Sequence, residues 1–307
     1  MGLLSAILLN VILPVFSLIA AGVLLHRKFS FDMNTLSKLT TYFLMPAVSF
    51  ANVYQSSLAG PVMLSILGFL CLQSLSLMLL ASLVAKYAKF DRGLAATFKN
   101  SVVLFNSGNF GLPVSQFVFQ HNPIGASVQI VVLIFQNLMT YTYGLFTSVS
   151  VANHGAKALY QFLKNPVLYA FGLGLTLHLF SVKIPGYLWS PLETTSDAFL
   201  AVALVTLGAQ SAYVSITRLS FPLVISLIGR LVLSPVIAFT IICLLGIEGV
   251  IAQALFIASS FPTSRNSALF ALEFNNRPEL AAQITVVSTI GSILTVTIVV
   301  YLSNVLF

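Results

Sequence analysis

The sequence predicts an all-α polytopic membrane protein of ten transmembrane helices, built as two inverted five-helix repeats with interrupted crossing helices 4 and 9. Hydrophobic residues make up 58% of the chain and charged residues 7%, whereas a soluble domain has about 25% charged residues. Many apolar stretches approach the roughly 20 residues that a bilayer-spanning helix needs. Proline, glycine and polar residues also interrupt the fourth span of each half, a pattern typical of transporters.

We expect ten spans joined by short connections, with no separate soluble domain. The spans are expected at residues 3–25, 35–54, 62–87, 94–120, 127–151, 166–181, 197–214, 222–246, 249–273 and 281–306. Residues 1–152 would form the first repeat and residues 160–307 the second. Because five spans form each half, the second half would be inverted in the membrane.

The basic residues predict the orientation of these spans. Of the 14 Lys and Arg residues, eleven lie on odd-numbered connections and only Lys183 lies on an even-numbered one. The eleven are Arg27, Lys28, Lys38, Lys86, Lys89, Arg92, Lys99, Lys157, Lys164, Arg218 and Arg277. Basic connections stay in the cytoplasm, so both termini are expected outside it, in a multi-pass protein of the cell membrane. The net charge of +7 then reflects topology and contact with lipid headgroups, not nucleic-acid binding.

Two polar interruptions are expected near the middle of the bilayer. Helix 4 reaches Asn106 about twelve residues after it enters, a rise of roughly 18 Å at 1.5 Å per residue, and helix 9 reaches Pro262 from the opposite face after a similar run. Proline and glycine should open both helices, and polar neighbours should satisfy the freed backbone groups. The expected crossover residues are Gly108, Gly111, Pro113, Pro262, Thr263 and Ser264. A simple proline kink in each helix is the alternative.

The charges near these interruptions favour an anionic substrate. Each second half-helix would start at mid-membrane and aim its positive dipole end there. Arg265 lies in the second interruption, where it could contact the substrate or hold backbone carbonyls, whereas no Asp or Glu lies in an expected span core. Arg230 is expected to snorkel to the cytoplasmic interface. The expected substrate-binding residues are Asn106, Asn109, Gln136, Asn137, Arg265 and Asn266.

Motifs of enzymes and metal sites are absent from the sequence. The chain has no His-Glu-x-x-His, Gly-x-Ser-x-Gly or Cys-x-x-Cys. Cys71 and Cys243 lie in apolar runs and are expected to be buried. We therefore expect no enzyme activity, no catalytic residue, no metal and no cofactor.

Five segments in order resemble the auxin efflux carrier family of membrane transporters, in a bacterial-type form with a short central loop. The segments are Asn106–Pro113, Asn165–Pro166, Leu207–Gln210, Phe261–Pro262 and Glu273–Pro278. The resemblance covers essentially the whole chain. It implies the fold of bile-acid symporters and sodium/proton antiporters, in which helices 4 and 9 cross. Helices 1, 2, 6 and 7 would form a scaffold and helices 3–5 and 8–10 a transport domain.

The same resemblance implies roles for particular residues and partners. Pro113 and Pro262 would be the crossover prolines, and Asn106 would lie near a substrate carboxylate. Family members often dimerise through the scaffold and carry organic anions, auxin in plants and suspected dicarboxylates in bacteria. The plant carriers have a long loop between helices 5 and 6, whereas this chain has only residues 152–165 there, which argues against auxin.

The sequence therefore predicts a secondary transporter of small organic anions, expected to be carboxylates, that works by elevator-type alternating access in the lipid bilayer. The alternatives are a sodium-coupled organic-anion symporter of the bile-acid type and a non-transporting membrane receptor that uses the same pocket.

Overall fold

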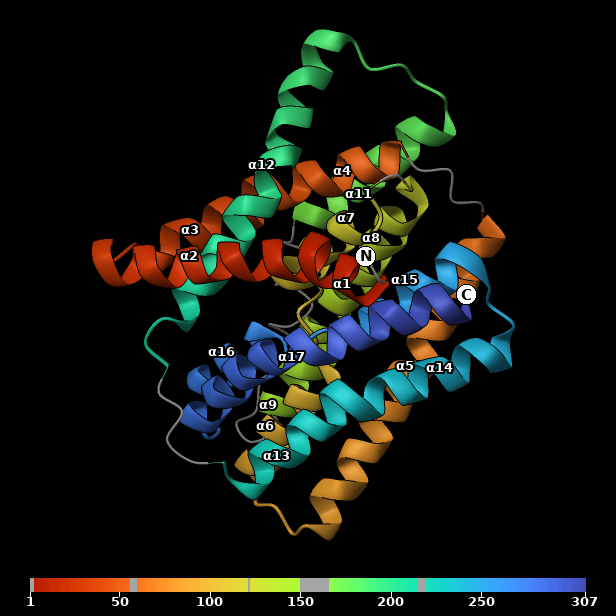
Figure 1. The fold of residues 1–307 in the computed structure, drawn as a ribbon. Coiled ribbons are helices and arrows are strands. Elements are labelled where there is room, and N and C mark those ends of the chain that lie inside the picture. Colours follow the sequence, from red (N-terminus) through yellow and green to blue (C-terminus); the bar gives the residue numbers. More distant parts are fainter. Residues whose placement is uncertain (1–2, 56–59, 121, 150–165, 215–218) are drawn as a thin grey trace. The chain divides into compact units, whose positions relative to one another are not determined.

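The computed structural model describes the 307-residue chain except residues 1–2, 56–59, 121, 150–165 and 215–218 (Figure 1). Lys157, Lys164, Asn165, Arg218 and the junction between the two expected repeats lie outside the described residues.

The described residues are helical, apart from short connections and one isolated bridge. In chain order the helices of the first half are α1 (Leu3–Ile7), η1 (Leu8–Ile12), α2 (Leu13–Phe29), α3 (Met33–Leu39), η2 (Thr40–Leu44), α4 (Met45–Tyr54), α5 (Gly60–Tyr87), α6 (Arg92–Val103), η3 (Ser107–Gly111), α7 (Leu112–Val118), α8 (Pro123–Met139), η4 (Thr140–Gly144) and α9 (Leu145–Val149). Those of the second half are α11 (Pro166–Leu179), α12 (Gly186–Ser211), α13 (Phe221–Leu227), η5 (Ile228–Leu233), α14 (Ser234–Leu245), α15 (Gly249–Ser259), α16 (Arg265–Glu273) and α17 (Pro278–Leu306). The labels η mark π-helical turns.

Each of the ten expected spans overlaps one or more described helical segments, and two of the spans, residues 94–120 and 249–273, are interrupted. Six helical runs are long and apolar enough to cross a membrane, judged by length and composition. They cover Leu4–Phe29, Val62–Tyr87, Pro123–Ser148, Gly186–Ser211, Phe221–Leu245 and Pro278–Leu306. The prediction of an all-helical polytopic chain is therefore confirmed, while the ten-span inverted repeat stays a prediction.

The expected start of the seventh span is wrong. The helix α12 begins at Gly186, eleven residues before the expected start at residue 197. Its first turns carry Pro191, Glu193 and Asp197. These residues lower the local hydropathy, so this stretch does not look like part of a span, but the backbone around them is helical. The two carboxylates consequently lie within a helix, on its exposed side.

Four of the five π-helical turns precede a proline. Pro14, Pro46, Pro113 and Pro235 each occupy one of the first two positions of the α-helix that follows η1, η2, η3 and η5. Proline cannot donate a backbone hydrogen bond and clashes with the carbonyl of the preceding turn. A wider turn before the proline relieves both problems, so the helical run continues through it.

The chain divides into two compact units. Unit 1 contains Met1–Ala59, Gly108–Ile134 and Leu163–Tyr213, and therefore α2, α4, α11 and α12. Its helices meet at small residues. A Cβ added at Gly22 of α2 would lie 2.1 Å from the Val205 carbonyl oxygen, and one at Gly208 of α12 would lie 1.9 Å from that of Ile19. The two helices thus touch backbone to backbone, as small residues allow in membrane helices.

Apolar side chains fill the remaining core of unit 1. The cluster consists of Leu44, Met45, Val48, Val53, Leu112, Ile130, Leu133, Val167, Phe199 and Ala203. Its members come from α4, α8, α11 and α12 among others, so this packing holds continuous helices together.

Unit 2 contains Gly60–Ser107, Phe135–Phe162 and Val214–Phe307, and therefore α5, α6 and α13–α17. An apolar cluster on α5 and α6 includes Leu77, Phe98 and Leu104. Unit 2 also buries many polar side chains, which are described with the site below.

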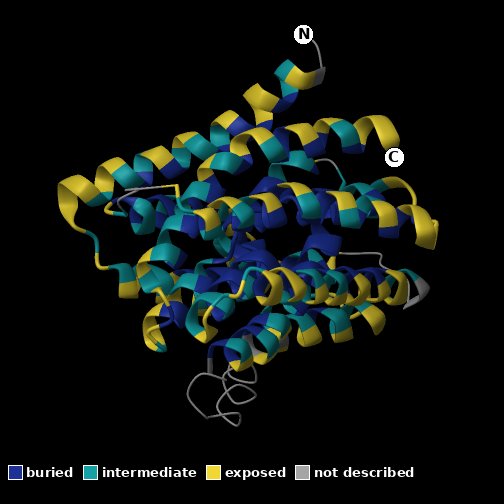
Figure 2. Ribbon diagram, turned by 90° about the horizontal axis from the view of Figure 1, so that it is seen from below, coloured by how far each residue is buried: buried dark blue, intermediate teal, exposed yellow. Residues whose placement is uncertain are grey.

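Long helices expose large apolar side chains along their outer turns, and exposed and buried residues alternate along them (Figure 2). Leu64, Leu75 and Leu244 are examples. Cys71 and Cys243 are also exposed, so the prediction that both are buried is wrong. Hydropathy alone gives this error because in a membrane helix an apolar residue can face lipid as readily as the protein core.

Candidate functional site

Helices 4 and 9 are interrupted, as the sequence predicts, and the interruptions pair with each other inside unit 2. The helix α6 ends at Val103 and α15 ends at Ser259. Phe105 then forms an isolated antiparallel bridge with Thr263. The Asn106 N–H donates to the Pro262 carbonyl at 2.8 Å, and the Ser264 N–H donates to the Leu104 carbonyl at 2.8 Å. We call the segment Leu104–Asn106 together with Ser260–Ser264 the crossover.

The interruption in helix 4 lies earlier than expected. We predicted that Gly108, Gly111 and Pro113 would open the helix. Instead the chain is extended at Leu104 and helical again from Ser107, so both glycines lie in η3. Pro113 is the second residue of α7, directly after η3, whose wider turn accommodates the missing N–H. A Cβ at Gly108 would lie 3.0 Å from Met45 Cε, so this glycine serves close packing within unit 1.

Thr263 anchors the crossover to neighbouring helices. Its hydroxyl donates to the Ser101 carbonyl of α6 at 2.8 Å, and its N–H donates to the Ser288 hydroxyl of α17 at 3.1 Å. These bonds satisfy backbone groups that the broken helices leave free, as an apolar membrane interior requires. Thr263 and Pro262 are both fully enclosed by the protein.

Asn106 and Gln136 bring amide groups into the interior of unit 2. Asn106 is 7% exposed and Gln136 is 3% exposed. The Asn106 Nδ2 and the Gln136 Nε2 are buried and have no hydrogen-bond partner among the described residues. A buried amide donor without a partner is costly, and such groups mark sites where a ligand can complete the bonding.

The helix α16 begins directly after the crossover. Its N-cap is Ser264, whose hydroxyl oxygen accepts the Asn266 N–H at 3.2 Å. Arg265 is the first residue of α16, and both Arg265 and Asn266 are partly exposed. The positive end of this helix and one guanidinium therefore occur together at the end of the crossover.

The remaining expected site residues are distributed over the two units. Asn137 is partly exposed on α8 in unit 2, next to Gln136 in the chain. Asn109, Gly111 and Pro113 belong to unit 1. The predicted convergence of two half-helix starts on one substrate stays a prediction, because η3 and α16 fall mainly in different units.

A second polar cluster ties α6 to its neighbours in unit 2. The Asn100 Nδ2 donates to the Gly144 carbonyl at 3.0 Å and to the Ser148 hydroxyl at 2.8 Å. The Asn276 Nδ2 donates to the Ser148 carbonyl at 3.0 Å, and the Thr97 hydroxyl donates to the Asn276 carbonyl. Four polar residues thus join α6, α9 and the α16–α17 connection.

An exposed ion pair closes the same end of unit 2. The Arg277 Nη2 lies 2.7 Å from the Asp91 Oδ2. Asp91 is also the N-cap of α6, where its Oδ1 accepts the Leu94 N–H at 2.8 Å. The Leu94 hydrogen bond, and after it the bond from Arg277, lower the pKa of Asp91 below its ordinary value.

The sequence interpretation missed the role of Arg230. We expected it to snorkel to the interface, but its exposed fraction is 0%. Its guanidinium bonds to carbonyl oxygens of both interrupted helices instead. The one local signal was the position of the arginine five residues before Pro235, within the π-helical turn η5.

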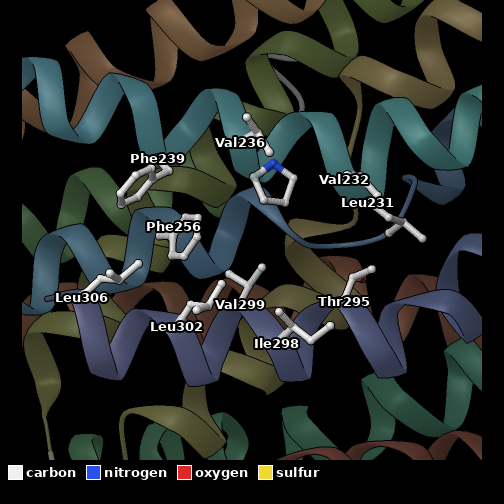
Figure 3. Close-up of a pocket in the computed structure, with 11 residues that line it drawn as sticks. Leu231, Val232, Val236, Phe239, Phe256, Thr295, Ile298, Val299, Leu302 and Leu306 are labelled. Carbon is white, nitrogen blue, oxygen red and sulfur yellow. The ribbon is translucent and has the colours of Figure 1, made fainter.

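The linings of two apolar cavities contain no crossover residue. A cavity of about 690 Å³ in unit 1 is lined by residues that include Phe43, Phe50 and Leu188, with Lys183 as its charged side chain. A cavity of about 370 Å³ in unit 2 lies among α14, α15 and α17 (Figure 3). The side chains that point into it, such as Val236, Phe256 and Val299, are apolar. Neither cavity contains an expected substrate-binding residue, and both suit hydrocarbon more than a carboxylate.

A chain with long apolar helices and a buried, polar crossover of two broken helices is a multi-pass membrane protein of the transporter type. Residues 7–300 match the model of the membrane transport protein family, and the chain belongs to this auxin efflux carrier-like family. It is 24% identical over 267 residues to an uncharacterized transporter of Methanothermobacter thermautotrophicus, in an alignment that covers 85% of this chain and 86% of the relative.

Proposed function

We propose that this membrane transporter is a secondary carrier, not an enzyme, that moves small organic anions of the carboxylate class. The observation that carries the proposal is the buried crossover, in which the unpartnered Asn106 amide lies one residue from the Phe105–Thr263 bridge. A site of this kind offers hydrogen-bond donors in an apolar interior. A carboxylate accepts several such bonds, and they are strong because the acceptor is charged.

The local charges support an anion over a cation. The start of α16 contributes a partial positive charge, and Arg265 adds a full one. Among the described residues, Asp and Glu side chains lie at the ends of helices or on the exposed side of α12, outside the crossover. A cation would find no carboxylate there, which favours the carrier over a sodium-coupled symporter.

The grouping of helices supports an elevator-type mechanism. The chain segments of expected helices 1, 2 and 6 and nearly all of helix 7 fall in unit 1, together with Gly108–Ile134 from expected helices 4 and 5, whereas α5, α6, α15 and α17 fall in unit 2. We propose that unit 1 acts as the scaffold, through which two copies dimerise, and that unit 2 carries the substrate. The proposal includes ten spans in the cell membrane as two inverted repeats, with both termini outside the cytoplasm.

Counterflow in proteoliposomes tests the transport function. Vesicles loaded with unlabelled malate or malonate should accumulate the labelled compound against its gradient when they contain the carrier. The Asn106→Ala variant should lose about ten- to a hundredfold in apparent affinity, since it removes a hydrogen bond to a charged group, worth about 1.5–3 kcal/mol. Binding of the dicarboxylate without any counterflow would instead identify a receptor, and uptake that requires sodium would identify a symporter.

Labelling of intact cells tests the orientation. Cysteines introduced at residues 2 and 307, in a chain without Cys71 and Cys243, should react with a membrane-impermeant maleimide. Protection of both positions until the cells are opened would reverse the proposed topology.

A further inference from the structure

Arg230 carries a full charge in the interior of unit 2. It lies in η5, within one of the helical runs long and apolar enough to cross the membrane, and is the largest fully buried side chain among the described residues. An arginine at such a position is costly unless its donors are bonded and its charge is compensated. The contacts of Nη1 and Nη2 bond these two nitrogens and compensate the charge, whereas the buried Nε has no hydrogen-bond partner among the described residues.

The guanidinium joins the first halves of the two interrupted helices. Its Nη1 donates to the Val102 carbonyl in the last turn of α6 at 3.0 Å. Its Nη2 donates to the Ser259 carbonyl at the end of α15 and to the Ser234 hydroxyl. The Ser234 hydroxyl donates in turn to the Ser259 carbonyl at 2.9 Å.

These carbonyls explain why the charge is tolerated without an acidic partner. The last carbonyls of a helix have no intrahelical donor and form the negative end of the helix dipole. Arg230 meets two such ends at once. Its guanidinium carbon also lies 5.0 Å from the centroid of the Phe105 ring, within the range of a cation–π contact. Phe105 is the residue that pairs with Thr263.

The neighbouring residues are shaped for this contact. A Cβ at Gly229 would lie 3.0 Å from Val102 Cγ2, so glycine allows η5 to approach α6 closely. The Gln73 Nε2 of α5 donates to the Ser234 hydroxyl at 3.3 Å. The arginine lies in η5, which continues into α14 at Ser234 and Pro235. The arrangement around it is therefore built from α5, α6, α15 and the η5–α14 run.

We propose that Arg230 is a fixed internal cation that holds the two halves of the crossover in register. It is a positioning residue and does not bind substrate. By bonding the Val102 and Ser259 carbonyls, it also occupies oxygens that could otherwise coordinate a metal cation. This proposal goes beyond the carrier function and holds for any substrate.

Chemical rescue of Arg230→Ala tests the proposal. The variant should lower the melting temperature of the purified protein by roughly 10 °C, as expected when a buried charged contact is broken. Millimolar guanidinium should restore at least half of this loss, because it refills the site with the same planar donors and charge. Urea has the same planar shape but no charge, and sodium has a charge but no N–H donors. Neither should therefore restore the melting temperature.

Arg27→Ala is the matched control. Arg27 also donates to one backbone carbonyl, that of Ala212, with its Nε at 3.1 Å and its Nη2 at 3.0 Å, but it is not fully buried. Guanidinium should not change the melting temperature of this variant. Equal rescue of Arg230→Ala by urea and guanidinium, or an Arg230→Ala protein as stable as the parent, would overturn the proposal.

A crosslink measures the positioning directly and needs no purified variant. Phe105 and Thr263 form a non-hydrogen-bonded antiparallel pair, for which the Cα atoms are about 4.5 Å apart, within disulfide range. Phe105→Cys and Thr263→Cys, placed in a chain with Cys71→Ser and Cys243→Ser, should therefore oxidise readily in membranes. Adding Arg230→Gln should slow this oxidation by about tenfold or more, and Arg230→Lys should slow it less, since it keeps the charge.

In Arg230→Ala the empty site can close, and then no added compound can restore stability. In that case the crosslinking experiment decides the proposal. An unchanged oxidation rate in the Gln variant would then show that Arg230 does not hold the register, and the proposal would fail. Slow oxidation with Gln and retained oxidation with Lys would support it.

Discussion

Unit 1 and unit 2 solve the problem of helix packing in a membrane in different ways. In unit 1, α2 and α12 run unbroken and touch backbone to backbone at Gly22 and Gly208. In unit 2, α6 and α15 stop in the interior, and side chains such as Arg230 and Thr263 satisfy the backbone groups that the breaks expose. The first arrangement depends on the absence of side chains and the second on particular polar ones, so substitutions should affect them differently.

The largest expected effect is a substitution at the close contact in unit 1. In Gly208→Val the new Cβ would overlap the Ile19 carbonyl, which is 1.9 Å from its position, and backbone cannot yield as a side chain can. We expect a loss of about 3 kcal/mol or more in stability, measured as a lower melting temperature and yield in detergent. Gly172→Ala is the control, because a Cβ there meets nothing within 4 Å. Normal stability of Gly208→Val would show that the two helices are farther apart than described.

The next effect concerns the crossover prolines. Pro262→Ala allows α15 to continue past Ser260, which would compete with the bond between the Pro262 carbonyl and the Asn106 N–H. We expect transport to fall by about tenfold or more, about 1.4 kcal/mol, with little change in yield. Pro113→Ala should also reduce transport, but less, because Pro113 lies outside the Leu104–Asn106 interruption, in a helical run that already continues through it. Full activity of the double variant would show that the prolines do not keep the crossover open.

Arg265 should respond to a change of charge. If Arg265 binds the substrate, Arg265→Gln should weaken anion affinity by about tenfold or more, about 1.4 kcal/mol, and Arg265→Lys should retain part of it. Direct binding measured by calorimetry with a dicarboxylate checks this, alongside the detergent-soluble yield of each variant. Unchanged affinity in a well-folded Gln variant would remove Arg265 from the site.

The smallest effect is expected at the exposed end of unit 2. The folded protein lowers the pKa of Asp91, so the carboxylate stabilises the fold above the ordinary pKa of 3.8, and this contribution disappears as the pH falls through the lowered value. Asp91→Asn should therefore reduce stability at neutral pH, by about 0.5 kcal/mol given the exposure of the pair, and should make no difference at pH values well below 3.8. Because Asn can also serve as an N-cap, a variant as stable as the parent at pH 7 would show that the charge of Asp91 and its ion pair contribute nothing.

Hydropathy and proline placement predict most of the helices, because burial in lipid and loss of a backbone donor are properties of single residues. The start of α12 was missed because Pro191, Glu193 and Asp197 lie on an exposed part of the helix. An exposed helix can carry polar residues, so low hydropathy there does not mean that the helix has ended. The interruption of helix 4 was expected at its glycines but lies at Leu104–Asn106, because it depends on pairing with the segment around Thr263, far along the chain.

Long-range partners also explain the mistaken expectation for Arg230. Its depth along the helix permits an interfacial position, and nothing nearby in sequence shows that the Val102 and Ser259 carbonyls will lie within reach. Asn106 was selected for its place in the interruption and from the family resemblance, and Gln136 for its polarity within a span; the structure places both amides in the interior. Polarity at depth therefore identifies candidates, while their partners follow only from tertiary structure.

The pairing of the two interruptions has a consequence for how the protein is made. Thr263 bonds to Ser101 across 162 residues of chain, so the ribosome must deliver helix 4 to the translocon long before its partner exists. During that interval the Leu104 carbonyl and the Asn106 N–H lack the bonds they make later, and each unsatisfied group costs several kcal/mol in hydrocarbon. A truncated first half should therefore remain associated with the insertion machinery or be degraded, and assembly should become complete only after the ninth helix has left the ribosome.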